Sequence, residues 1–245
     1  MGQGADNGTV TIATTSGGMP AYDARPAGEA RGGVVVIQEA FGVTSHIEDV
    51  TRRFATAGFR AVAPHLFYRT GDPVLSYDSL EEIWPHLKEL KGDQVLDDVN
   101  AVLGYLEDAA GLGSQRVAIV GFCMGGSVTA LTAAKRQLGA AVSFYGGGLA
   151  EGRFGMPPLL ELAPTFQTPW LGLYGGQDEG IPVEQAEALR AAAKRSSVPN
   201  DLVLYPDAAH GFHCNDRPAS YHEASATDGW QRTLAWFDEH LSSPG

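Results

Sequence analysis

The sequence predicts an α/β fold built on a mostly parallel sheet of about eight strands, with helices on both faces and antiparallel strands at the N-terminal edge. Three observations predict this class. Short apolar, β-branched runs alternate with segments of helical period along most of the chain. Most of these runs are apolar throughout, which is typical of strands covered on both faces. There is also no internal repeat and no long biased tract, so a solenoid is not expected.

The strands are expected in a definite order. Residues 9–14 and 19–24 read as a hairpin, and the loop that follows is rich in Gly and Arg. The later strand candidates, bounded by Gly, Pro or Asp, lie at residues 33–37, 60–63, 116–121, 140–145, 170–174 and 202–205.

Helical segments separate these strands. The first opens with a capping-box pattern at Ser45 and Glu48 and closes at Gly58. Further helices are expected at residues 95–106 and 127–135, directly after Pro182, and at residues 230–241.

Residues 67–92 are the least regular part of the chain. They contain two prolines and a Gly-Asp turn, and we expect a loop with one short helix around residues 79–90. This segment is a candidate lid over a site. We expect one domain over residues 1–245, with a catalytic core at about residues 10–242.

Composition excludes several classes of function. The chain has 245 residues, with 17 Lys and Arg against 29 Asp and Glu, and the net charge of −12 opposes binding to nucleic acid or to anionic membranes. No apolar stretch is long enough to span a bilayer, and the first residues lack the pattern of a signal peptide. Cys123 and Cys214 are too few for a disulfide scaffold. We therefore expect a cytoplasmic protein, a monomer by default.

The sharpest motif is Gly121-Phe-Cys123-Met-Gly125, in which an apolar strand runs into a helix of small residues. This is the pattern of a nucleophile elbow with Cys in place of Ser. Its glycines permit a tight turn, and the helix N-terminus favours a thiolate. The alternative is that Cys123 is only a small buried hydrophobe at a tight crossing.

An acid and a base follow this cysteine in chain order. Asp178 comes after the strand at residues 170–174, and His210 comes after the strand at residues 202–205. Loops that follow parallel strands meet at one edge of the sheet, so Asp178 can orient His210 toward the thiol. Taken alone, Asp178 could be a turn residue and His210 a solvated loop histidine. The ordered set favours nucleophilic catalysis.

A further acid, Glu39, ends the strand at residues 33–37. Beside Cys123 it could accept the thiol proton, and the backbone N–H of Ala40 could form an oxyanion hole with that of Met124. The alternative for Glu39 is a solvated strand end.

With Gln38-Glu39-Ala40-Phe41-Gly42, the cysteine elbow, Gly-Gly-Gln-Asp178 and Ala-His210-Gly-Phe in place, the chain resembles the dienelactone hydrolases of the α/β-hydrolase fold from about residue 10 to 242. The resemblance implies hydrolysis of an enol-lactone formed in aromatic catabolism, with no metal or organic cofactor. It implies Cys123 as nucleophile, His210 and Asp178 as its partners, Glu39 as acceptor of the thiol proton, and Ala40 and Met124 as oxyanion donors.

The chain departs from the family pattern where the substrate carboxylate is held. Members typically place one arginine before the helix that corresponds to residues 95–106 and one shortly after the catalytic histidine, here His210. In this chain, residues 71–92 contain no arginine. Arg69 and Arg217 are the candidates, and each could equally be a surface ion-pair partner. Candidate pocket linings are the aromatic residues Phe41, Trp84, Tyr145, Phe212 and Tyr221, which could also be plain core. Cys214 and the nearby histidines do not form a zinc pattern, so no metal is expected.

Two other functions stay open at this point. The first is an esterase or thioesterase with a different acyl substrate, which the missing arginine favours. The second is a thiol sensor or binding protein without catalysis, which the ordered Asp178 and His210 oppose.

Overall fold

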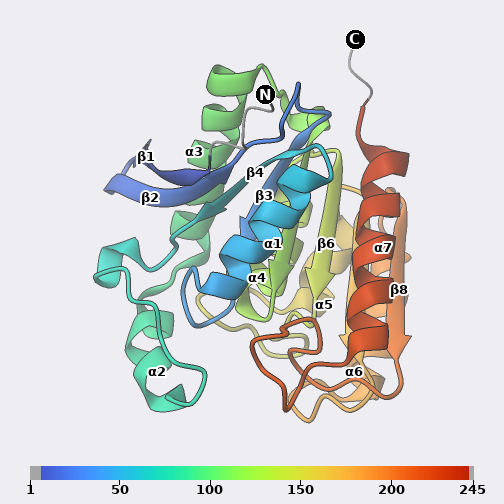
Figure 1. Cartoon of the computed structure of the whole chain (residues 1–245). Helices are drawn as coiled ribbons and strands as arrows, with labels where there is room; N and C mark the ends of the chain where they lie inside the picture. Colours follow the sequence, from blue (N-terminus) through green and yellow to red (C-terminus); the bar gives the residue numbers. More distant parts are fainter. Residues whose placement is uncertain (1–6, 243–245) are drawn as a thin grey trace.

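The computed structural model describes residues 7–242, and its central feature is one eight-stranded sheet (Figure 1). Its strand order is β1-β2-β4-β3-β5-β6-β7-β8. β1 pairs antiparallel with β2 and β2 antiparallel with β4, whereas all later pairs are parallel. The strands are β1 (Gly8–Thr14), β2 (Gly17–Ala24), β3 (Gly33–Ile37), β4 (Arg60–Pro64), β5 (Val117–Phe122), β6 (Ala140–Phe144), β7 (Trp170–Gly175) and β8 (Asn200–Tyr205). The predicted sheet and its N-terminal hairpin are confirmed.

Helices cover both faces of this sheet. α1 (Ser45–Thr56) and α7 (Glu223–His240) lie on the face toward the viewer in Figure 1, where the ring of Phe54 contacts those of Trp230 and Phe237. The other helices are α2 (Leu80–Glu89), α3 (Gly92–Ala110), α4 (Met124–Lys135), α5 (Leu159–Leu162) and α6 (Val183–Ala193). Short 3₁₀ turns lie at Tyr68–Thr70, Ser114–Arg116 and Ala163–Thr165. Among the residues that the structure describes, no helix is both long and apolar enough to cross a membrane.

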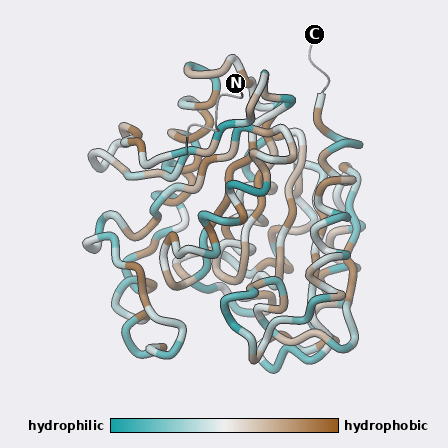
Figure 2. The backbone as a smooth tube through the Cα atoms, in the orientation of Figure 1, coloured by the Kyte–Doolittle hydropathy of each residue, from teal (hydrophilic) through white to brown (hydrophobic). Residues whose placement is uncertain are grey.

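The core follows from the sequence pattern. Every residue of β3, β4, β5, β6 and β7 is buried, because these strands have helices on both sides. Figure 2 shows the apolar residues gathered along the strands and the inner sides of the helices. The apolar runs of the sequence are therefore the centre of the sheet.

One detail of the first helix differs from the expectation. Thr44, not Ser45, precedes α1, and no side chain caps the helix. The hydroxyl of Ser45 instead donates to a carboxylate oxygen of Asp216 at 2.9 Å, and Nδ1 of His46 lies 3.0 Å from Oδ1 of Asn215. The capping box is wrong because a distant loop takes the Ser45 side chain. This contact ties the start of α1 to the loop that follows His210.

Candidate active site

The carboxyl ends of the parallel strands carry the reactive side chains that the sequence singles out. Glu39 follows β3, Cys123 follows β5, Asp178 follows β7, and His210 follows β8. β3 lies between β4 and β5, so strand order reverses at this place in the sheet. Open α/β sheets bind ligands at such a switch point, because the loops on its two sides diverge and leave a crevice.

Cys123 occupies a strained turn between β5 and α4. Its φ is +55° and its ψ is −117°, a conformation that L-residues rarely adopt. The turn is tight enough that a β-carbon on Gly121 would overlap the carbonyl of Gly125, and one on Gly125 would overlap the carbonyls of Ile37 and Gln38. The two glycines of the motif are thus sterically required. The turn leaves Cys123 partly exposed at the first turn of α4.

Asp178 and His210 form a short hydrogen bond. Nδ1 of His210 lies 2.6 Å from Oδ2 of Asp178. The other carboxylate oxygen accepts the backbone N–H of Gly180 at 2.9 Å, and the Asp178 side chain is 1% exposed. Because both oxygens of Asp178 are engaged, the carboxylate holds the imidazole in one orientation.

The charge state of His210 depends on its two partners. Burial works against the charged imidazole, but the negative charge of the Cys123 sulfur and the hydrogen bond to Asp178 outweigh it. Together they raise the pKa of His210 to about 10. The geometry therefore favours a protonated His210 imidazole at neutral pH.

Glu39 is a buried acid without a hydrogen-bond partner. It is 1% exposed, and neither carboxylate oxygen has a partner among the described residues. An unpaired buried carboxylate is costly and therefore uncommon unless it has a role. The charge of Glu39 adds to burial in raising the pKa of Tyr77, Tyr145 and Cys214, so the acid lies close to all three.

Tyr77 is a residue of this site that the sequence reasoning missed. Its ring contacts that of Phe41 at 4.6 Å, and its hydroxyl lies 3.1 Å from Oγ1 of Thr44 and 3.5 Å from the sulfur of Cys214. It belongs to the irregular stretch between β4 and α2, where no period or motif marks individual residues. Only its partners on other segments place it beside Glu39.

Cys214 is a different kind of thiol from Cys123. It is fully buried, and burial together with the charge of Glu39 raises its pKa to about 12. It is therefore neutral and poorly reactive at ordinary pH. Among residues 7–242, no group of three or more His, Cys, Asp or Glu is arranged to hold a metal ion.

The two expected oxyanion donors are close neighbours of the elbow. Neither the N–H of Ala40 nor that of Met124 donates a hydrogen bond within the described residues. The close approach of Gly125 to the carbonyls of Ile37 and Gln38 joins the start of α4 to the segment that carries Ala40. Both N–H groups thus remain available for an oxygen atom of a substrate.

Arg217 lies with this group of residues. Its guanidinium carbon is 5.5 Å from the ring centroids of Phe41 and Tyr77. Its Nη1 atom is 2.8 Å from the position that a β-carbon on Gly211 would take, directly after His210. No carboxylate of the described residues forms an ion pair with it.

Of the expected aromatic linings, three lie here. The ring of Tyr145 is 5.1 Å from that of His210 and 5.2 Å from that of Phe212. Phe41 contacts Tyr77, as described. All three side chains are nearly or fully buried, so they form the floor of the site rather than a movable wall.

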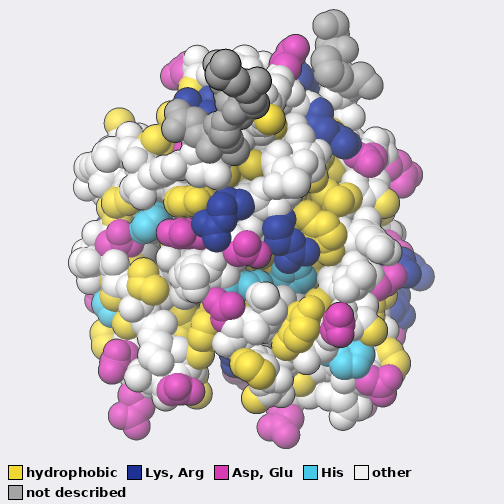
Figure 3. Space-filling view, in the orientation of Figure 1, with side chains coloured by type: hydrophobic (Ala, Val, Ile, Leu, Met, Phe, Trp, Pro, Cys, Tyr) yellow, Lys and Arg dark blue, Asp and Glu magenta, His cyan; other side chains and the backbone are white. Residues whose placement is uncertain are grey.

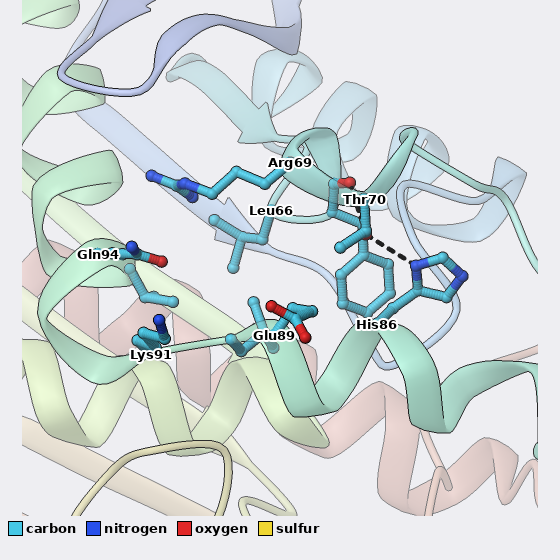
Figure 4. Close-up of a pocket in the computed structure, with 10 residues that line it drawn as sticks. Leu66, Arg69, Thr70, His86, Glu89, Lys91 and Gln94 are labelled. Carbon is cyan, nitrogen blue, oxygen red and sulfur yellow. Dashed lines mark hydrogen bonds between the residues drawn. The ribbon is translucent and has the colours of Figure 1, made fainter.

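Arg69 has a different position from the one expected. Its two terminal nitrogens bind the carboxylate of Asp98 at 2.7 and 2.8 Å, and Asp98 is fully buried in α3. Figure 4 shows the Arg69 side chain directed away from Thr70 and His86. A guanidinium held by two oxygens of a buried partner is a structural group, and we do not assign a substrate to it.

Trp84 and Tyr221 lie apart from the other expected residues. Trp84 is 58% exposed on α2. Tyr221 is 37% exposed and lines a separate hollow of about 290 Å³ with Arg53 and His213. Figure 3 shows acidic and basic side chains interspersed on the face of the molecule that it presents.

Comparison with known proteins identifies the family of this chain. Residues 19–241 match the dienelactone hydrolase family. A candidate carboxymethylenebutenolidase of Salmonella typhimurium is 41% identical over 97% of this chain and 89% of its own length. A candidate 2-oxo-3-(5-oxofuran-2-ylidene)propanoate lactonase of Bradyrhizobium is 31% identical over 95% of this chain and 94% of its own length.

A solved structure shows the same fold. A candidate dienelactone hydrolase from Klebsiella pneumoniae superimposes with a TM-score of 0.89 at 38% identity, over 97% of this chain and all of the other. Family, relatives and fold agree over nearly the whole length. The chain therefore belongs to the dienelactone hydrolase family and is an α/β-hydrolase of that kind.

Proposed function

We propose that the protein opens a carboxylate-bearing enol-lactone by nucleophilic attack of Cys123. The observation that carries the proposal is the set of charges around the elbow: His210 held by Asp178 at 2.6 Å on one side, and the unpaired buried Glu39 on the other. A lone reactive thiol would need neither. The Bradyrhizobium relative is named for a lactone of this class, which supports the substrate.

The first half of the reaction transfers the acyl group. The Cys123 sulfur attacks the lactone carbonyl carbon, and the carbonyl oxygen becomes an oxyanion that accepts hydrogen bonds from the N–H groups of Ala40 and Met124. Collapse of this intermediate breaks the ring C–O bond and leaves a thioester on Cys123. The enolate that leaves takes a proton from His210.

The second half releases the product. His210, now neutral, accepts a proton from water, and the resulting hydroxide attacks the thioester carbonyl. The free acid leaves and the thiolate returns beside the imidazolium. No cofactor enters these steps.

Glu39 and Arg217 couple substrate binding to nucleophile formation in this proposal. A substrate carboxylate that binds Arg217 approaches Glu39, and repulsion between the two like charges favours uptake of the thiol proton by Glu39. The thiolate would then form chiefly when the anionic substrate is present.

Turnover of cis-dienelactone tests the proposal. We expect the wild-type protein to hydrolyse the lactone and Cys123→Ser to lose at least about a thousandfold in kcat/KM, because a serine hydroxyl is not ionised by this site. p-Nitrophenyl acetate serves as the uncharged comparison. A wild-type protein that cleaves the aryl ester but none of the dienelactones would overturn the assigned substrate.

One observation favours a second function, that of a general esterase or thioesterase. The segment at residues 71–92 contains no arginine, and Arg69 is held by Asp98, so only Arg217 is left of the two expected carboxylate-binding residues. Equal kcat/KM for neutral and carboxylate-bearing esters would favour this function. The free thiols of Cys123 and Cys214 support a reducing, cytoplasmic location for either activity.

A further inference from the structure

One groove of the molecule has no role in the mechanism above. It has a volume of about 440 Å³, and its lining residues are Trp84, Leu87, Lys88, Arg153, Phe154 and Gly155. Trp84, Leu87 and Lys88 belong to α2, and the other three belong to the loop between β6 and α5. This volume is typical of a site for a small molecule.

The two walls of the groove are fixed to each other and to the core. The N–H of Gly92, the first residue of α3 and three residues after the end of α2, donates to the carbonyl of Gly155 at 3.4 Å. The N–H of Met156 donates to the carbonyl of Arg153 at 2.9 Å, and that of Leu159 to Gly148 at 3.1 Å. Phe154 has a φ of +56°, which is a strained value for a residue with a side chain. The loop is therefore held in a defined shape.

Arg153 connects this groove with the reactive residues. Its Nη1 atom lies 3.5 Å from the position that a β-carbon on Gly147 would take. The carbonyl of Gly147 accepts the hydroxyl of Ser127 at 2.8 Å, in the first turn of α4 beyond Cys123. Two residues earlier, Tyr145 packs against His210. The guanidinium thus stands at the edge of the active site.

A second hollow also places Arg153 close to the loop of Asp178. Arg153 also lines a hollow of about 270 Å³ that reaches Gly180. The N–H of Gly180 donates to Asp178. Arg153 therefore lines both the groove along α2 and the hollow that reaches the loop of Asp178.

The charges of the groove are unbalanced. Lys88 and Arg153 both line it, and within residues 7–242 neither forms an ion pair. Glu151 is the acidic residue that lines the neighbouring hollow together with Arg153. In a chain with a net charge of −12, two unpaired cations that share one groove favour an anionic occupant. The exposed indole of Trp84 adds a flat apolar surface.

We propose that this groove is a subsite for the distal end of an elongated substrate, and that Arg153, assisted by Lys88, binds an anionic group there while Trp84 stacks on the arm that carries it. The subsite rests on the proposed acyl transfer at Cys123 and narrows its substrates. Arg153 is a specificity-determining residue here, distinct from Arg217, which lies by Glu39.

Aryl monoesters of dicarboxylic acids test the proposal. p-Nitrophenyl esters of succinate, glutarate and adipate place a carboxylate at increasing distance from the reacting carbonyl, and the hexanoate ester is the neutral counterpart of the longest. We expect Arg153→Gln to raise KM for the adipate ester about fivefold and to leave its kcat unchanged. Both KM and kcat for the hexanoate ester should stay the same. Arg153→Lys should keep much of the preference for the adipate ester over the hexanoate ester.

The control is Arg195→Gln, which removes the same charge from an exposed position after α6. This substitution should leave KM and kcat unchanged for every ester. The proposal is overturned if Arg153→Gln affects charged and neutral esters alike, or if only Arg217→Gln removes the preference for the adipate ester.

A second readout does not depend on turnover. Adipate should protect Cys123 of the wild-type protein from alkylation by iodoacetamide, and Arg153→Gln should weaken that protection about fivefold. Equal protection in both proteins would contradict the subsite. If dienelactones are not hydrolysed but the dependence on Arg153 is present, the assigned lactone fails and the subsite stands.

Discussion

His210 determines the expected dependence of activity on pH. Its pKa of about 10 lies above the ordinary 6.5, so the charged form is favoured. The stabilisation from its partners is fully present below pH 6.5 and is lost as pH rises through 10. We expect kcat/KM to fall above about pH 10.

Asp178→Asn tests why the pKa of His210 is raised. Without the carboxylate, one cause of the raised pKa is lost, so the alkaline limit of activity should move to lower pH and kcat/KM should fall about a thousandfold. The measurement is a profile of kcat/KM against pH with an aryl ester. An unchanged alkaline limit would show that Asp178 does not control the charge of His210.

Glu39→Gln should separate stability from activity. The amide is uncharged, so the unfolding free energy should rise by about 1 kcal/mol as the cost of an unpaired buried carboxylate disappears. Hydrolysis of the anionic lactone should fall, because the acceptor for the thiol proton is lost. Urea denaturation and lactone kinetics on the same preparation measure both. A Glu39→Gln protein that is less stable would mean that Glu39 has a structural partner.

The sequence predicts some residues of the site and not others, for a physical reason. Cys123, Asp178 and His210 each lie within a few residues of the end of a strand, so the alternation of elements places them. Arg69 and Tyr77 depend on partners from other segments, Asp98 in α3 and Thr44 before α1. A single sequence contains no signal for such long-range pairs.

At the scale of elements, the elbow depends on the contact between α4 and the end of β3. Gly125→Ala would place a methyl group against the carbonyls of Ile37 and Gln38, which are backbone atoms and cannot rotate away. We expect a loss of about 2 kcal/mol or more in unfolding free energy and loss of turnover. Thermal denaturation and ester hydrolysis check both.

Gly104→Ala is the matched control. Gly104 lies within α3 and nothing is within 4 Å of its β-carbon position. Alanine should therefore stabilise the protein by about 0.5–1 kcal/mol without affecting turnover. Equal effects of the two substitutions would contradict the steric account of the elbow.

The elements differ in how well the sequence predicts them. All eight strands appear within a few residues of their expected positions. For β3 to β7 the reason is that continuous apolar runs are needed wherever helices cover both faces. The helix expected around residues 79–90 is confirmed as α2. α5 was missed, since Leu159–Leu162 is only four residues long and follows two prolines. The role of residues 67–92 as a lid stays a prediction.

At the scale of the whole molecule, one buried ion pair joins the hairpin to the parallel sheet. Arg60 of β4 donates to Asp23 of β2 at 2.8 and 3.2 Å, and the hydroxyl of Tyr105 in α3 donates to the same carboxylate. Burial alone would raise the pKa of Asp23, but these hydrogen bonds outweigh it and hold the pKa below the usual 3.8. Removal of one partner leaves a buried charge unpaired.

Asp23→Asn should therefore destabilise the protein by about 3 kcal/mol at neutral pH. Because the folded-state pKa is lowered, the contribution of Asp23 is present above pH 3.8 and is lost as pH falls through the lowered value. Unfolding in urea at several pH values should show a constant difference from wild type down to about pH 4, and convergence below it. A difference that persists unchanged at pH 2 would exclude the charge as its cause.

The exposure of Trp84 has a practical consequence for optical measurements. Trp170 is fully buried, and Trp230 and Trp236 are half-buried in α7, whereas Trp84 is 58% exposed on α2. Aqueous quenchers such as iodide should therefore remove the emission of Trp84 first. The protein thus carries an intrinsic fluorophore on a helix that lines an open groove. Movement of α2 or shielding of its indole by a bound molecule can thus be followed in the unlabelled protein, on the time scale of a stopped-flow experiment.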